Sequence, residues 1–372
     1  MRRGLGTSAH AVAVITAVMV GVVGCSDEHG DRDVGGGRAV AEDSTSTSTS
    51  SPTTTARAAG TPLPPGAVAA RRKFFGDGNV DGGGHLREGR VIVSWFGISS
   101  LAVAIGDKVV LLDTAINNPG DCVSGGGGAY VPATEEDLVA LAPVAIFVGH
   151  GHSDHACHLG RLVGDTGATL VGMPQHCALA GAGVDCVEVL AADSPFGTTA
   201  EVTVPGLGDD ARITAVRNLH SGRDGEVPCN TGGCESVLYR FEVGDLSFVW
   251  NDTTGPISTA APELAAALRR LPPSDVELGA IVGLGTTTQG MRDPVDYAEA
   301  LRVAELYPLH HDTARGGASG GFRTGLEAAI AERRPELAAK LHWLQDPADY
   351  LRPVVLGADD GARSSWKARA SG

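Results

Sequence analysis

The feature that most constrains this chain is the run HGHSDH at residues 150–155, which follows an apolar segment at 144–148. The apolar segment is typical of a buried β-strand, so the run begins where a strand ends. In an extended or turning segment, the two histidines at alternate positions project to the same side, and the Asp-His pair can reach a second position. The candidate ligands are His150, His152, Asp154 and His155.

Four potential metal ligands within six residues indicate a metal centre. We expect His150 and His152 to hold one ion, and Asp154 and His155 a second ion roughly 4 Å away, with water or hydroxide between them. Structural zinc sites are usually closed and rich in cysteine, whereas these ligands leave open positions and therefore favour catalysis. Two divalent ions are expected; Zn²⁺ is preferred, and the same ligands also suit Mn²⁺ or Fe²⁺.

Apolar alternation predicts a mixed fold around the motif. Segments 91–96, 101–105 and 108–113 read as strands, and Thr134 to Asp137 resembles a capping box that opens a helix ending before Pro143. A second succession of strands and helices follows. Its strands are expected near 169–171, 213–216, 237–243, 246–250, 278–282 and 351–356, and its helices at 262–271, from Asp293, and within 322–341. This order predicts an α+β fold, a four-layer αββα sandwich.

The HxHxDH pattern at 150–155 resembles the signature of the metallo-β-lactamase superfamily. Segments 218–222, 250–255 and 306–312 resemble the later ligand motifs of that family, and the resemblance covers roughly 91–356. It implies an αββα hydrolase with further ligands in these segments. The resemblance implies that His220 completes the first metal's set, that Asp252 bridges the ions, and that His310 binds the second ion beside Asp154 and His155.

Two positions in these motifs depart from the family pattern or leave a choice. Asn251 stands where the family usually has glycine and is expected to crowd the turn. His311 is an alternative ligand to His310, but the spacing from Pro308 favours His310, which leaves His311 to line the pocket. Asp113, at the end of an early strand, is either a carboxylate that orients a ligand histidine or a turn residue.

The resemblance implies metal-assisted hydrolysis, in which Asp154 binds the second ion and helps to orient the nucleophile. Ester, lactone, thioester and phosphoester bonds are the expected substrates, because Asp252 stands where true β-lactamases lack a bridging aspartate. The alternatives are a lipid-anchored protein that binds a solute or metal without turnover, a β-lactamase, and a mononuclear iron oxygenase of the same superfamily. A small-molecule substrate is expected in any of the enzymatic cases.

The N-terminus predicts export. Residues 1–24 combine two arginines with an apolar stretch too short to span a bilayer, and the stretch ends before Cys25 in a sequence that resembles a bacterial lipobox. An ordinary secretory signal is the alternative. We expect a lipid on Cys25, a disordered tether rich in Ser, Thr, Pro and Gly over 25–75, a hydrolase domain over 76–360 and a tail over 361–372. The protein is then extracytoplasmic and anchored to the cell membrane as a lipoprotein.

The remaining six cysteines fit a compartment where disulfides persist. Cys177 with Cys186 and Cys229 with Cys234 would close short loops, which leaves Cys122 with Cys157 by exclusion, although six cysteines allow fifteen pairings. A thiolate metal site is the alternative. The net charge of −15 and the absence of a run rich in lysine and arginine argue against nucleic acid as a partner, and the sequence does not reveal the oligomeric state.

Overall fold

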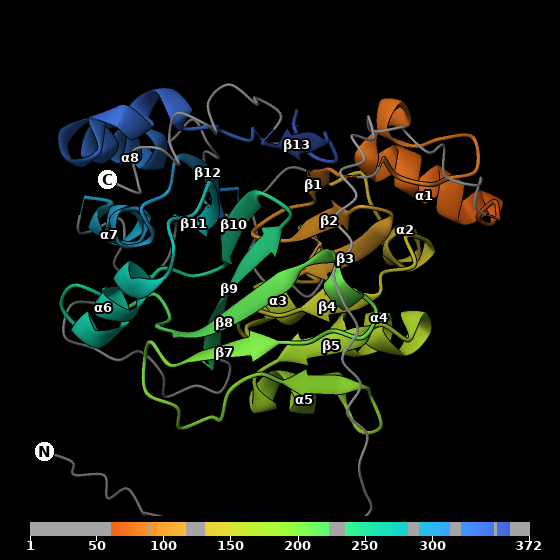
Figure 1. Ribbon diagram of the computed structural model, residues 1–372, viewed down its shortest axis with the longest axis horizontal. Coiled ribbons are helices and arrows are strands. Elements are labelled where there is room, and N and C mark those ends of the chain that lie inside the picture. Colours follow the sequence, from red (N-terminus) through yellow and green to blue (C-terminus); the bar gives the residue numbers. More distant parts are fainter. Residues whose placement is uncertain are drawn as a thin grey trace, which may run out of the picture. The chain divides into compact units, whose positions relative to one another are not determined.

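The computed structural model describes residues 61–87, 89–116, 131–222, 235–281, 290–312, 321–345 and 348–357. These residues form two mixed sheets that lie against each other (Figure 1). Strand order in the first sheet is β13-β1-β2-β3-β4-β5-β6, and in the second β12-β11-β10-β9-β8-β7.

The first sheet is antiparallel from β13 to β3 and parallel from β3 to β6. Its strands are β1 (Val91–Trp95), β2 (Leu101–Ile105), β3 (Lys108–Leu112), β4 (Ala145–Phe147), β5 (Thr169–Gly172), β6 (Cys186–Glu188) and β13 (Val354–Leu356). The second sheet is antiparallel from β7 to β10 and parallel from β10 to β12. Its strands are β7 (Thr199–Val202), β8 (Arg212–Asn218), β9 (Ser236–Val243), β10 (Leu246–Asn251), β11 (Val276–Ala280) and β12 (Glu305–Leu309).

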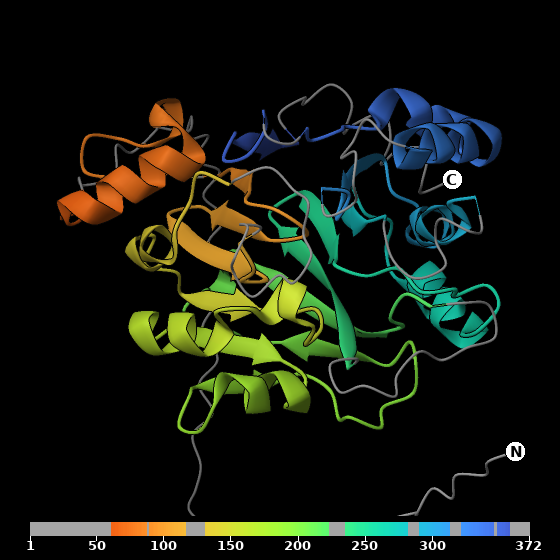
Figure 2. The same ribbon diagram turned by 180° about the vertical axis from the view of Figure 1, so that it is seen from behind.

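Helices cover the outer face of each sheet (Figures 1 and 2). The first sheet carries α1 (Pro65–Phe75), α2 (Glu135–Ala140), α4 (Leu159–Thr166) and α5 (Pro174–Ala180), and the second carries α6 (Pro262–Arg270), α7 (Arg292–Leu301) and α8 (Gly321–Arg333). The short helix α3 (Ser153–Ala156) contains part of the HxHxDH motif. None of the helices in the described residues combines the length and the apolar character needed to cross a bilayer.

The main core lies between the sheets. The Phe147 ring of the first sheet contacts Tyr239 and Phe241 of the second, with ring centroids 5.1 and 5.2 Å apart, and all three side chains are fully buried. A second apolar core fills the space between the outer face of the second sheet and helices α6, α7 and α8. The predicted α+β fold with four αββα layers is therefore confirmed.

Local signals explain several element boundaries. The capping box predicted at the start of α2 is present: Thr134 Oγ1 accepts a hydrogen bond from the backbone N of Asp137, and the Asp137 carboxylate accepts one from Thr134 N. Strands β1, β2 and β3 lie where the alternating segments predict them. Strand β13 is shorter than expected, beginning at Val354.

The predicted tether is too long at its C-terminal end. The expectation placed disorder over 25–75, but Pro65–Phe75 forms α1, and the side chains of Phe74 and Phe75 are fully buried in the main core. Burial of two aromatic rings supplies the apolar surface that a disordered segment lacks. The rest of the predicted tether up to residue 60, the signal segment with Cys25, and the tail at 361–372 lie outside the described residues.

Candidate metal centre

The candidate ligands come from loops at the ends of four strands. His150, His152, Asp154 and His155 follow β4; His220 follows β8; Asp252 follows β10; and His310 follows β12. Asp113, at the end of β3, joins them. The candidate ligands, without Asp113, meet in three overlapping groups, and the ligand atoms of each group lie within 4.8 Å of one another. The groups are His150, His152 and His220; Asp154, His155 and His310; and His150, His155 and Asp252.

The first group consists of three imidazoles. Nε2 of His150 lies 3.2 Å from Nδ1 of His152, and the His220 ring centroid lies 4.7 and 4.6 Å from those of His150 and His152. Two nitrogen ligands bound to a tetrahedral zinc ion at the usual distance stand about 3.3 Å apart. The spacing of His150 and His152 therefore fits two ligands of one ion.

The second group combines two imidazoles with a carboxylate. Nε2 of His155 lies 3.1 Å from Nε2 of His310, and Asp154 Oδ2 lies 3.4 Å from His310 Nε2 and 3.8 Å from His155 Nε2. These spacings also suit the ligands of one ion. His155 is fully buried, whereas Asp154 and His310 are partly exposed, so the group is open on one side.

Asp252 lies between the two groups. Its Oδ2 is 2.6 Å from Nδ1 of His150 and 3.5 Å from Nδ1 of His155. Its Oδ1 is buried and, among the described residues, has no hydrogen-bond partner. An unsatisfied buried carboxylate oxygen is costly without a cation nearby, so this atom also fits a metal centre. The bridging role of Asp252 remains a prediction.

The electrostatics of the cluster keep most of its imidazoles neutral. Burial, reinforced by the neighbouring histidines, lowers the pKa of His150 well below its usual value and that of His220 to about 4. Burial raises the pKa of Asp252. Burial alone would raise the pKa of Asp154. The nearby His155 and His310 have the larger effect and hold the pKa of that carboxyl below its usual range. Neutral imidazoles and an ionised carboxylate are the forms that bind a metal.

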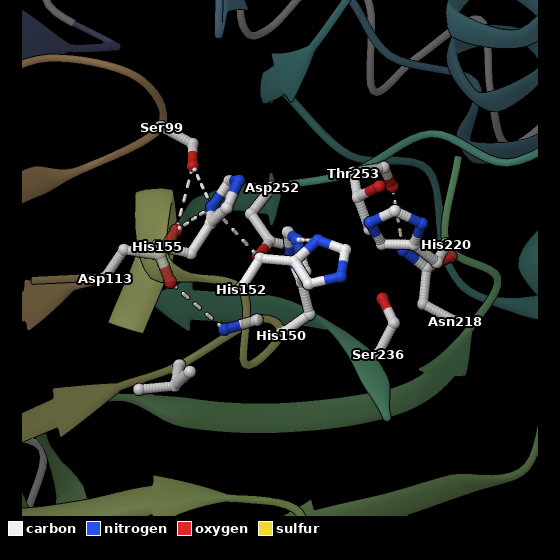
Figure 3. Close-up of polar contacts among 12 residues, drawn as sticks. Ser99, Asp113, His150, His152, His155, Asn218, His220, Ser236, Asp252 and Thr253 are labelled. Atoms are coloured by element: carbon white, nitrogen blue, oxygen red, sulfur yellow. Dashed lines mark hydrogen bonds and ion pairs between the residues drawn. The ribbon is translucent and has the colours of Figure 1, made fainter. Parts of the chain in front are cut away.

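Of the two roles predicted for Asp113, its contacts suit that of a carboxylate that orients a ligand histidine. It is fully buried, and its Oδ2 lies 2.7 Å from Nδ1 of His155 and accepts a hydrogen bond from Ser99 Oγ at 2.8 Å (Figure 3). Its Oδ1 accepts a hydrogen bond from the backbone N of Gly149 at 3.2 Å. Metal-bound histidines usually donate their second ring N–H to such a group.

Strained backbone surrounds the centre. Ile98, Asp113 and His310 have φ values of 55, 56 and 63°, a region that residues other than glycine rarely adopt. The structure holds Ile98 from both sides: its N donates to both oxygens of Asp312, and its O accepts from His310 N at 2.8 Å. Strain of this kind concentrates where surrounding contacts fix a functional side chain.

The adjacent histidines take different positions. His310 lies in the second group, whereas the His311 ring is fully buried, with its centroid 5.3 Å from that of Trp95 and 5.6 Å from that of Trp343. The geometry therefore agrees with the choice of His310, and His311 lies among aromatic rings.

The centre also involves residues that the sequence analysis does not identify. Ser99 contacts Asp113, and Gly149 lies directly against Asp252. Asn251, expected to crowd the turn, is instead accommodated in β10, where its Oδ1 accepts a hydrogen bond from Asn218 Nδ2 at 2.9 Å. These roles depend on contacts between distant segments, and no local pattern reveals them.

The described cysteines form disulfides. The predicted Cys177–Cys186 bond is present, with Cα atoms 5.9 Å apart, and Cys157 is also disulfide-bonded. Cys122, the predicted partner of Cys157, lies outside the described residues, as do Cys229 and Cys234. Since Cys157, Cys177 and Cys186 are oxidised, they do not form the alternative thiolate site.

The chain is similar to several known proteins. No protein-family model matches the sequence. A UPF0173 metal-dependent hydrolase of Pyrobaculum aerophilum is 24% identical over 226 residues, which span 59% of this chain and 84% of the relative. Solved structures that resemble the chain include the following two. Igni18, a metallo hydrolase from Ignicoccus hospitalis, matches with 16% identity and a TM-score of 0.49 over 72% of this chain and 98% of its own. The metallo-β-lactamase-fold protein YhfI from Bacillus subtilis matches with 12% identity and a TM-score of 0.43 over 72% of this chain and 99% of its own.

Proposed function

We propose that this chain is a hydrolase that cleaves an ester, lactone, thioester or phosphoester at a dinuclear metal centre. The observation that carries the proposal is the meeting of six side chains from three loops in two neighbouring ligand groups, with Asp252 between them. The six are His150, His152 and His220, and Asp154, His155 and His310. The name of the Pyrobaculum relative, a metal-dependent hydrolase, supports the same reaction class.

Some residues of the centre would bind the metal ions, and others would orient the attacking water and the substrate. Divalent ions in these groups would lower the pKa of a coordinated water toward neutrality and polarise a carbonyl or phosphoryl oxygen. His152, Asp154 and His310 are the partly exposed members, so the substrate approaches from their side. Asp154 is ionised and can accept a hydrogen bond from water on that open side, which orients the water toward the substrate.

The test combines metal analysis with substrate profiling. The purified full-length chain, loaded in turn with Zn²⁺, Mn²⁺ or Fe²⁺, is assayed on chromogenic esters, lactones, thioesters and phosphodiesters, and on a β-lactam. We expect two ions per chain and turnover of at least one of the first four classes. His150→Ala and His310→Ala should abolish it, and the control His342→Ala, at a partly exposed ion pair with Glu305, should not.

Other outcomes would replace the proposal. Metal binding without turnover in any class would indicate the solute- or metal-binding protein, and turnover restricted to the β-lactam would indicate a β-lactamase. One iron per chain with consumption of oxygen would indicate the oxygenase.

We also propose that the hydrolase is exported and held at the membrane by a lipid on Cys25. The lipobox-like sequence before Cys25 supports this, and the tether after it would hold the domain clear of the membrane surface. Cell fractionation tests the anchor: the wild-type chain should sediment with membranes, and Cys25→Ser should release it. A wild-type chain found in the soluble extracellular fraction would instead indicate an ordinary secretory signal.

A further inference from the structure

Two fully buried carboxylates lie behind the histidines, one from each sheet. Asp113 follows β3 of the first sheet, and its Oδ2 is 2.7 Å from His155 Nδ1. Asp252 follows β10 of the second sheet, and its Oδ2 is 2.6 Å from His150 Nδ1. Figure 3 shows both carboxylates beside the histidine cluster. The first and the last histidine of the HxHxDH motif therefore have equivalent partners.

These contacts decide which ring nitrogen is available to a metal. A carboxylate only accepts hydrogen bonds, so an imidazole that donates through Nδ1 keeps its lone pair on Nε2. Nε2 of His150 faces His152 Nδ1 at 3.2 Å, and Nε2 of His155 faces His310 Nε2 at 3.1 Å. In both cases the nitrogen opposite the carboxylate faces another histidine of its ligand group.

Gly149 lies between the two carboxylates. Its backbone N donates to Asp113 Oδ1 at 3.2 Å, and its backbone O accepts from Val237 N at 2.9 Å, so its position is fixed. A Cβ atom at this position would lie 2.1 Å from Asp252 Cγ and 2.2 and 2.3 Å from the two carboxylate oxygens. The Asp252 carboxylate thus occupies the space that any other residue at 149 would fill with its side chain.

We propose that Asp252 is a positioning residue for His150 and that glycine is required at position 149 to leave room for the Asp252 carboxylate. The inference rests on the metal centre proposed above and adds a role to Asp252, because positioning through Oδ2 leaves Oδ1 for a cation. It assigns to each histidine its nearer carboxylate: Asp252 to His150, and Asp113, at 2.7 Å against 3.5 Å for Asp252, to His155.

The decisive variant is Gly149→Ala in the full-length chain, tested with Zn²⁺ alone. The φ angle of Gly149 is not in the left-handed region, so alanine is conformationally allowed and the methyl group changes only the space beside Asp252. Loss of a partner that orients a ligand histidine typically weakens metal binding about 10–100-fold. We expect a loss of this size in zinc affinity, measured by competition with a chromogenic chelator.

Proton NMR of the zinc-loaded protein separates positioning from a general structural effect. The wild-type spectrum should contain two low-field signals from imidazole Nδ1–H groups bonded to carboxylates, one from His150 and one from His155. Asp252→Asn and Asp113→Asn should each shift one signal and so assign them. Gly149→Ala should remove or shift the His150 signal and leave that of His155.

Gly206→Ala is the matched control, since its Cβ would crowd Val144 Cβ at 2.7 Å without touching a candidate ligand. It should preserve zinc affinity and both signals. Wild-type affinity with both signals intact in Gly149→Ala, or a wild-type His150 protonated at Nε2, would overturn the proposal. If Gly149→Ala does not fold, Asp252→Asn carries the same expectation for affinity and for the His150 signal. Failure of the proposed function looks different: zinc and both signals would be present, but no substrate would be cleaved.

Discussion

Two buried polar regions lie on the two sides of the second sheet, and they differ in whether their side chains can carry charge. The inner region faces the first sheet and contains the carboxyl groups of Asp113 and Asp252, which contact His155 and His150. The outer region lies under α7 and consists of neutral side chains that form a hydrogen-bonded chain. Tyr297 OH donates to Asn218 Oδ1 at 2.6 Å, and Asn218 Nδ2 donates to Asn251 Oδ1 at 2.9 Å. The two buried carboxyl groups of the inner region thus lie where cations would balance their charge, whereas neutral groups join the strand ends on the outer side.

The outer region stabilises the backbone that carries the ligands. Asn218 ends β8 two residues before His220, and Asn251 ends β10 immediately before Asp252. Asn218 Nδ2 also donates to the backbone O of Thr253, just after Asp252. The two asparagines therefore connect the ends of strands that are separated by β9. The inner region therefore determines which ring nitrogens of the histidines can bind a metal. The outer region fixes the distance between the loops that follow β8 and β10.

Removal of the metal should have the largest effect on activity and stability, because it leaves the carboxyl groups of the inner region without a cation. Buried carboxylates without a compensating cation destabilise the folded state. An ion present at about 1,000 times its dissociation constant stabilises the folded protein by about 4 kcal/mol. We expect chelation to abolish hydrolysis and to lower the midpoint of thermal unfolding, measured by differential scanning calorimetry, and Zn²⁺ to restore both. A midpoint that does not respond to chelator would contradict the contrast between the regions.

The Asp113→Asn substitution should come next in size. The amide keeps the shape of the side chain but replaces one of the two carboxyl oxygens, and Oδ2 is the oxygen that faces His155 Nδ1. Zinc affinity should fall about 10–100-fold, since this is the usual cost of losing such a partner. Isothermal titration calorimetry provides the measurement, and Asp209→Asn, in an exposed 3₁₀ turn, is the control. Equal affinities for wild type and Asp113→Asn would show that this carboxylate does not orient His155.

A substitution in the outer region should lower the free energy of unfolding and leave metal binding unchanged. Asn251→Ala removes the acceptor for Asn218 Nδ2, although that amide keeps its bond to Thr253 O. Loss of one buried hydrogen-bond partner costs about 1–3 kcal/mol. Urea denaturation of the zinc-loaded protein should show a loss in this range with two ions still bound. A loss of one ion without a change in stability would assign Asn251 to the inner region instead.

The sequence predicts the centre better than its surroundings, for a physical reason. His150, His152, Asp154 and His155 lie within six residues, so a local pattern contains them. The contact between Gly149 and Asp252 joins positions 103 residues apart through the packing of two sheets, and a sequence pattern carries no signal for such a contact. Ligand identity is a local property here, whereas ligand orientation is a tertiary one.

The fold shows the same division. Apolar runs predict β1, β2 and β3, which are buried along nearly their whole length. They do not predict β6 or β7, the short edge strands at one end of each sheet, which are partly exposed and lack an apolar run. The segment at 65–75 is likewise assigned to the tether, since only packing against the sheet shows that Phe74 and Phe75 are core residues.

The most specific effect concerns Glu277 of β11, whose carboxyl lies beside Asn251 in the outer region. Burial raises its pKa to about 8, although contacts with Asn251 and Arg334 lower it, so the side chain is neutral below that pH. The folded state then binds the proton more tightly than the unfolded state, whose pKa lies near the ordinary value of 4.5. The contribution of Glu277 to stability is therefore complete below about pH 4.5 and declines as the pH rises toward 8, by up to about 1.4 kcal/mol per pH unit.

Glu277→Gln replaces the neutral acid with a neutral amide of the same shape and removes this decline. The difference in unfolding free energy between the variant and the wild type should shift in favour of the variant from pH 5 to pH 8 and become constant above pH 8. Urea denaturation at pH 5, 6.5, 8 and 9 measures the difference, in which other titrating groups cancel. Parallel stability curves would mean that Glu277 is ionised in the folded state, and the outer region would then hold a buried charge just as the inner region does.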